Sequence, residues 1–102
     1  MDSRLILHEE LCNTLGTRNV YYNPPESLKL NYPCIVYNRS GINKLNANDR
    51  IYKKMNRYSL TVIDPDPDSD IPDRLIERFE YCSYDTGYVA NNLNHDRLTL
   101  YH

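Results

Sequence analysis

The stretch Met55–Pro67, with the sequence MNRYSLTVIDPDP, decides how this chain folds. Apolar residues alternate along it at Tyr58, Leu60 and Val62, which is the period of two that is typical of a half-buried β-strand. The stretch ends in Asp64-Pro65-Asp66-Pro67, and proline lacks the backbone donor that a sheet requires. We therefore expect a strand with one buried face that stops at this acidic loop.

Size, charge and cysteine content limit the class of protein. A chain of 102 residues is expected to be a single domain, residues 1–102, with one modest core. The net charge of −2 argues against binding of nucleic acid by the whole surface. Three cysteines without CxxC spacing predict free, buried thiols in a reducing compartment. No leader or long apolar run is recognisable, so we expect synthesis in the cytoplasm and no contact with a membrane.

The remaining patterns place two helices and four further strands around the central one. Leu7, Leu11 and Leu15 form a stripe that predicts a helix over residues 3–15, ended by Gly16. A second helix is expected from residue 71 to about residue 80, with Asp70 as its N-cap. The other strands are expected at residues 19–22, 34–38, 81–90 (bent or bulged at 85–87) and 97–101, with a turn at 91–95. The fold class is α+β: a mixed, mainly antiparallel sheet with two helices packed on it, in the order α-β-β-β-α-β-β.

Residues 42–54, INKLNANDRIYKK, separate two predicted strands and show no clear period. We interpret them as a long loop or a flexible hairpin arm, at about residues 42–55, and loops of this length are usually functional or disordered. Basic residues gather here, and Tyr52 lies among them. Six basic residues stand against the single acid Asp49: Arg39, Lys44, Arg50, Lys53, Lys54 and Arg57.

An acidic loop follows the central strand. Its alternate carboxylates, Asp64, Asp66, Asp68 and Asp70, suggest a calcium loop, but Ser69 replaces the glycine that such a loop needs. We therefore expect no metal and a solvated loop at the start of a helix. The basic arm and this acidic loop could meet between identical subunits, which is the head-to-tail contact of a ring. Ile6 lies off the apolar stripe of the first helix, so it is either an exposed residue or a further subunit contact.

No set of residues points to catalysis. Asn94-His95-Asp96 places an imidazole beside a carboxylate, but neighbours in a strand point to opposite faces, so the two groups are not expected to converge. The chain lacks the common nucleophile, zinc-protease, phosphate-loop and dinucleotide motifs. We therefore predict no enzyme activity, no catalytic residues and no cofactor.

Four stretches carry a resemblance to a known family, and together they span nearly the whole chain. They are LHEELCNTLGTRNVYY (Leu7–Tyr22), NPPESLKLNYPCIVY (Asn23–Tyr37), RYSLTVIDPDPDSDIPD (Arg57–Asp73) and NNLNHDRLTLY (Asn91–Tyr101). In these stretches the chain resembles the small tail completion proteins of long-tailed bacteriophages and prophages, also known as minor tail or tail terminator proteins. None of the stretches is a catalytic signature.

The resemblance implies a structural virion protein that forms a homo-oligomeric ring, of six copies, at the head-proximal end of the phage tail. Such a ring would end the tail tube and join it to the head-tail connector protein, and DNA would pass through its lumen without sequence-specific binding. The arm at Lys44–Lys54 would then reach a neighbouring ring, a tube subunit or the lumen. Three alternatives remain open: a head-tail adaptor or stopper, a cytoplasmic prophage-encoded module that binds a host protein, and a small protein that binds nucleic acid through the basic arm.

Overall fold

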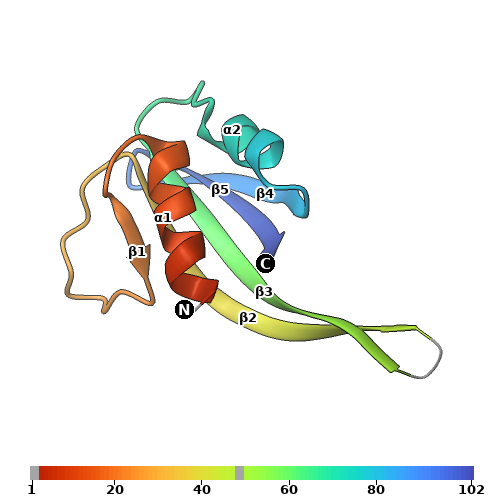
Figure 1. Ribbon diagram of the computed structural model, residues 1–102. Helices are drawn as coiled ribbons and strands as arrows, with labels where there is room; N and C mark the ends of the chain where they lie inside the picture. Colours follow the sequence, from red (N-terminus) through yellow and green to blue (C-terminus); the bar gives the residue numbers. More distant parts are fainter. Residues whose placement is uncertain (1–2, 48–49) are drawn as a thin grey trace.

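The computed structural model describes residues 3–47 and 50–102, and the side chains of residues 4–42 and 55–102. The described residues form one five-stranded sheet with two helices on one face, in the predicted chain order (Figure 1). The elements are α1 (Ser3–Leu15), β1 (Val20–Tyr22), β2 (Cys34–Ala47), β3 (Arg50–Asp64), α2 (Ile71–Arg78), β4 (Cys82–Ala90) and β5 (Leu93–Tyr101). The α+β class and the mainly antiparallel sheet are confirmed, since only β1 and β2 run parallel.

The strand that contains Tyr58, Leu60 and Val62, β3, lies at the centre of the sheet. Neighbouring strands follow the order β1-β2-β3-β5-β4, so β3 is paired on both sides. Tyr58, Leu60 and Val62 are buried, as their alternation predicts, and they face the helices. In the register Leu60 lies between Tyr37 of β2 and Leu98 of β5, both fully buried. The core is therefore a single layer between the sheet and the two helices.

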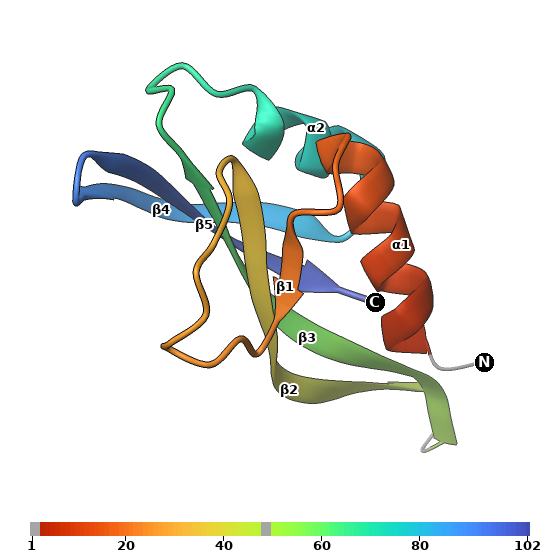
Figure 2. The ribbon, with the colours of Figure 1, turned by 90° about the vertical axis from the view of Figure 1, so that its left-hand side faces the viewer.

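Both helices cover the same face of the sheet, as the two views show (Figures 1 and 2). Leu7, Leu11 and Leu15 of α1 are buried, and Gly16 ends the helix with a φ of +91°, the left-handed conformation that glycine tolerates best. The described residues contain no helix that is long and apolar enough to cross a membrane. Neither of the described helices lies on the opposite face of the sheet, whose residues on β3 and β5 include Ser59, Thr61, Arg97 and Thr99.

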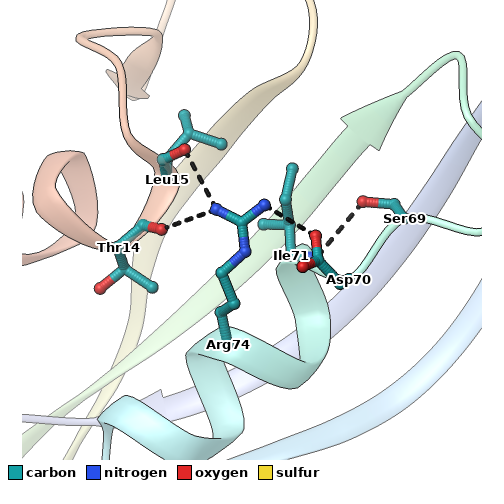
Figure 3. Close-up of polar contacts among 6 residues, drawn as sticks. All are labelled: Thr14, Leu15, Ser69, Asp70, Ile71 and Arg74. Carbon is teal, nitrogen blue, oxygen red and sulfur yellow. Dashed lines mark hydrogen bonds and ion pairs between the residues drawn. The ribbon is translucent and has the colours of Figure 1, made fainter.

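Arg74 joins the two helices at their adjoining ends (Figure 3). Its guanidinium donates to the backbone oxygens of Thr14 and Leu15, at 3.2 and 3.4 Å, and to Asp70 Oδ1 at 2.7 Å. The two oxygens belong to the last turn of α1, whose carbonyls have no partner within the helix. Asp70 is the N-cap residue of α2, as predicted, but its side chain makes no capping hydrogen bond because the carboxylate pairs with Arg74. Ser69 Oγ accepts from the Ile71 N–H instead.

Residues 42–47 and 50–54 are strand and not loop, whereas residues 48–49 lie outside the described part of the chain. Strand pairing continues along β2 to Ala47 and resumes in β3 at Arg50, so the two strands form a two-stranded arm that projects from the body of the domain (Figure 1). Of the two predicted alternatives, a long loop or a flexible hairpin arm, the backbone pairing agrees with the hairpin arm, and its flexibility stays a prediction. The sequence shows no strand period here because a two-stranded arm packs neither face against a core. Apolar and polar residues therefore need not alternate along it.

A bulge marks the point where the arm leaves the body. Register shifts between Arg39 and Gly41, which leaves Ser40 as the extra residue. The Arg57 guanidinium crosses to this bulge and donates to the Ser40 carbonyl at 2.9 Å and to Ser40 Oγ at 3.2 Å. This crosslink fixes the base of the arm.

The turn of the β4–β5 hairpin is shorter than the sequence predicts. Its turn consists of Asn91 and Asn92, with φ of 53° and 61°, and asparagine is among the residues that accept this left-handed conformation. The predicted turn at 91–95 is wrong beyond Asn92, because β5 begins at Leu93. The predicted irregularity in β4 is confirmed, since the register shifts between Tyr84 and Thr86.

Candidate interaction surfaces

The basic residues that the sequence singles out fall into two groups. Arg39 is exposed, whereas Arg57 is engaged at the Ser40 bulge within its own chain. Lys44, Arg50, Tyr52, Lys53 and Lys54 have backbones in the arm, but their side chains lie outside the part of the chain that the structure describes. All six basic residues therefore lie on or beside the arm in the strand register.

Two carboxylates of the acidic loop accept hydrogen bonds from backbone N–H groups of the loop itself. Asp64 Oδ1 accepts from the Asp66 N–H and Asp66 Oδ1 accepts from the Asp68 N–H, both at 2.9 Å. Asp64 is buried, and the Arg74 hydrogen bond lowers the pKa of Asp70 below its usual value. Among the residues described, no three His, Cys, Asp or Glu side chains gather as metal ligands would. The loop therefore presents Asp66 and Asp68 to solvent as a rigid acidic turn.

His95 and Asp96 point to opposite faces of β5, as strand geometry predicts. His95 stacks on Tyr88, with ring centroids 4.7 Å apart and planes 8° apart. Asp96 Oδ1 accepts from the Tyr84 hydroxyl at 2.8 Å, which raises the pKa of Tyr84. Each group is satisfied by an aromatic partner on β4, so the pair does not form an acid–base site.

A shallow pocket lies where the acidic loop approaches the β4–β5 hairpin. Its volume is about 310 Å³, and its lining consists of Pro67, Tyr84, Gly87, Tyr88, Val89, Asn94, His95 and Asp96. Gly87 is required for its shape, because a Cβ there would lie 2.4 Å from the Tyr84 hydroxyl oxygen and 3.0 Å from Asp96 Oδ1. Sequence reasoning missed this pocket, since its residues come from two strands and a loop that only the register brings together.

Ile6 is 40% exposed, in agreement with its position off the stripe of α1. It lines a shallow hollow with Leu5, His8, Glu9 and Glu10 along the outer side of the helix. Leu5, which also points outward, is 50% exposed. The two side chains form a small apolar patch, and the expectation of a subunit contact at Ile6 stays a prediction.

The three cysteines are free, as expected. Cys12 and Cys34 are buried and Cys82 is half-buried. Burial raises the pKa of the Cys34 thiol to about 11, and burial with the nearby Asp85 carboxylate raises that of Cys82 to about 11. Both thiols are therefore protonated and unreactive at neutral pH.

A group of rings lies beneath the first half of α1. The hydroxyl of the fully buried Tyr37 lies 2.8 Å from His8 Nδ1, and the Tyr37 ring contacts those of Tyr22 and Tyr58. Arg4 covers the Tyr22 ring at 4.3 Å and reaches the Tyr37 hydroxyl at 3.5 Å. Burial, followed by the charges of Arg4 and Arg18, lowers the pKa of His8. His8 is thus a neutral, hydrogen-bonded residue at the edge of the core.

The lowered pKa of His8 predicts a pH dependence of stability. The unfolded chain binds the proton more readily than the folded one, so the His8 contribution is complete above the ordinary pKa of 6.5 and declines as pH falls below it. Urea denaturation at pH 7.5 and pH 5.5 should show that His8→Gln loses less stability between these pH values than the wild type. Leu5→Ala, at an exposed residue of the same helix that does not titrate, is the control and should keep the wild-type difference. An unchanged difference in His8→Gln would refute the assignment.

Comparison of the chain with models of protein families, with curated proteins and with solved structures found no match.

Proposed function

We propose that the chain is a structural subunit that assembles head-to-tail with copies of itself into a ring, as a tail completion protein at the head-proximal end of a phage tail. The ring, six copies in the resemblance, would contact the tail-tube protein on one side and the head-tail connector on the other. Its role in the virion would be mechanical, with no catalytic residue and no cofactor. The resemblance of four sequence stretches is the basis for the phage assignment.

The observation that carries the oligomeric part of the proposal is the position of the arm. In both views the arm projects from one end of the molecule, and the turn of the β4–β5 hairpin lies at the opposite end (Figures 1 and 2). The longest dimension of the chain is 50 Å, against 25 and 23 Å across. A projecting arm at one end supports a contact between different surfaces of successive copies, and such contacts close into rings when the rotation allows.

Charge supports the same arrangement. From Arg39 to Arg57 the sequence has six basic residues and one acid, whereas the hairpin segment from Tyr84 to Asp96 contains two acids and no lysine or arginine. The acidic loop adjoins the second segment at the shared pocket. Opposite charges at the two ends favour association of one end with the other and disfavour association of like ends.

Shortening the arm tests the proposal. In the register Asn43 pairs with Met55, so residues 44–54 can be replaced by Asn-Gly, a pair that closes a tight hairpin. We expect light scattering over a concentration series, followed by electron microscopy, to show rings for the wild type and monomers for the variant. Virions that carry the variant should have tails that are absent or of abnormal length.

Circular dichroism serves as the control for folding, because the core lies outside the replaced segment. A wild type that stays monomeric, also in the presence of tail-tube protein, would overturn the ring. Unchanged rings and normal virions with the shortened arm would show that the arm does not make the contact.

A further inference from the structure

The outer edge of β4 is the most open strand edge of the sheet. β4 is the last strand in the order β1-β2-β3-β5-β4, and among the described strands it pairs with β5 alone. Its sequence, CSYDTGYVA, contains no lysine, arginine or proline, which are the residues that commonly block such edges. The opposite edge of the sheet is β1, which has three residues and is followed by Pro24 and Pro25. The sheet is therefore protected at one edge and open at the other.

The part of this edge beyond the bulge has an apolar surface. Beyond the bulge Tyr88 is 49% exposed and Val89 is 70% exposed, the largest value among the large hydrophobic residues described. Tyr84, which is 48% exposed, lies before the bulge and hydrogen-bonds to Asp96, on the sheet face opposite to the Tyr88–His95 stack. These three side chains line the pocket, which also contains the Asp96 carboxylate. An extended segment that pairs with residues 86–90 would lie beside these side chains, and its own side chains would alternate between the face of Tyr88 and the face of Tyr84 and Asp96.

The arm has the complementary features. β1 pairs with β2 at Ile35–Tyr37, and β5 pairs with β3 from Arg57 onward, so beyond these points each described strand of the arm has one neighbour. The arm thus has unpaired backbone groups along both outer edges, in a sequence that carries the local excess of positive charge. Because the arm and residues 86–90 lie at opposite ends of the molecule, they can meet only between two copies (Figures 1 and 2).

We propose that residues 86–90 of β4, with the adjoining pocket, are the docking surface for the two-stranded arm of a second copy. A strand of the arm adds to the sheet at β4, which brings the positive charge of the arm sequence to the end of the molecule that holds Asp96. This inference rests on the proposed self-assembly and names the surface that receives the arm. Backbone hydrogen bonds would align the arm strand with residues 86–90. The negative charge near this edge favours the basic arm over the β4 edge of another copy.

A pair of variants isolates this contact. The arm-shortened protein, with Asn-Gly in place of residues 44–54, keeps β4 but cannot donate an arm. Val89→Lys keeps the arm but introduces a positive charge at the receiving edge, while Val89→Thr preserves the branched shape and is the matched control. Since Val89 is so exposed, neither substitution disturbs the core. We expect Val89→Lys to weaken self-association about tenfold or more, as a like charge in a contact does, and Val89→Thr to leave it nearly unchanged.

The decisive measurement is a nuclear magnetic resonance titration of ¹⁵N-labelled arm-shortened protein with unlabelled Val89→Lys. The one arm-to-β4 contact then available is between the arm of the second protein and β4 of the first. We expect shifts or broadening at the amides of residues 86–90, lost at high salt, and a mixture that stops at the heterodimer. Titration with unlabelled arm-shortened protein should leave these amides unchanged.

Four results would overturn the inference: no change at residues 86–90 up to millimolar protein, changes confined to another surface, changes in the arm-shortened control, and undiminished self-association of Val89→Lys. Changes in the control would indicate that two β4 edges pair with each other. If the wild type forms rings but the amide signals of residues 86–90 do not change, this docking surface is rejected and the proposed ring stands. A monomeric wild type with silent β4 amides would reject both proposals.

Discussion

Leu60→Ala is expected to lower the free energy of unfolding by about 2–5 kcal/mol, the range for truncation of a buried leucine. Leu60 is fully buried at the centre of β3, paired with Tyr37 on one side and Leu98 on the other. All three side chains face the helices, so the cavity would open in the middle of the single core layer. The total free energy of unfolding of a domain of this size is about 5–15 kcal/mol, so the variant should be close to unfolding at 37 °C.

Urea denaturation followed by circular dichroism measures this loss. Thr61→Val is the matched control, because Thr61 is the next residue along the strand, points to the uncovered face and is only partly buried. The control keeps the branched shape and should change stability by less than about 1 kcal/mol. A loss below about 1 kcal/mol in Leu60→Ala would mean that the layer between sheet and helices is not the core of the domain.

Arg74→Ala is expected to lower stability by about 1–2 kcal/mol, less than a buried charged network because the side chain is partly exposed. The substitution leaves the Thr14 and Leu15 carbonyls without their donor and removes the partner of Asp70. These groups close the end of α1 against the start of α2 (Figure 3). Arg74→Lys keeps the charge but not the planar fork that reaches three acceptors, so it should recover only part of the loss.

Arg78→Ala provides the comparison, since Arg78 lies on the same helix with its guanidinium 3.8 Å from Glu10 and its side chain 54% exposed. A solvent-exposed pair of this kind contributes about 0–1 kcal/mol. Hydrogen exchange gives a local reading: the Gly16 amide, which donates to the Cys12 carbonyl, should exchange faster in Arg74→Ala than in Arg78→Ala. Equal exchange and equal stability in the two variants would show that Arg74 does not hold the helix ends together.

The positions of some residues on the candidate surfaces could be predicted from the sequence, and those of others could not. The angular position of Ile6 on its helix predicts that the side chain lies outside, and it does. The prolines of the acidic loop predict that the strand ends there, and it does. The sequence groups Arg57 with the basic residues of the arm, whereas in the structure it crosslinks the Ser40 bulge. The β4 pocket was not foreseen, because Tyr84 and Asp96 are twelve residues apart and meet only through the register of β4 and β5.

The sequence by itself determined the order of helices and strands, the buried face of β3 and the stripe of α1, because each depends on local period and on Pro, Gly and Asn at the ends of elements. It also determined the opposed directions of His95 and Asp96, which follow from strand geometry. Tertiary structure alone decided that residues 42–47 and 50–54 pair as an arm, that Arg74 closes α1 and that β4 is the open edge. Those outcomes depend on which segments become neighbours, and pairing between distant residues leaves no periodic signal within either partner.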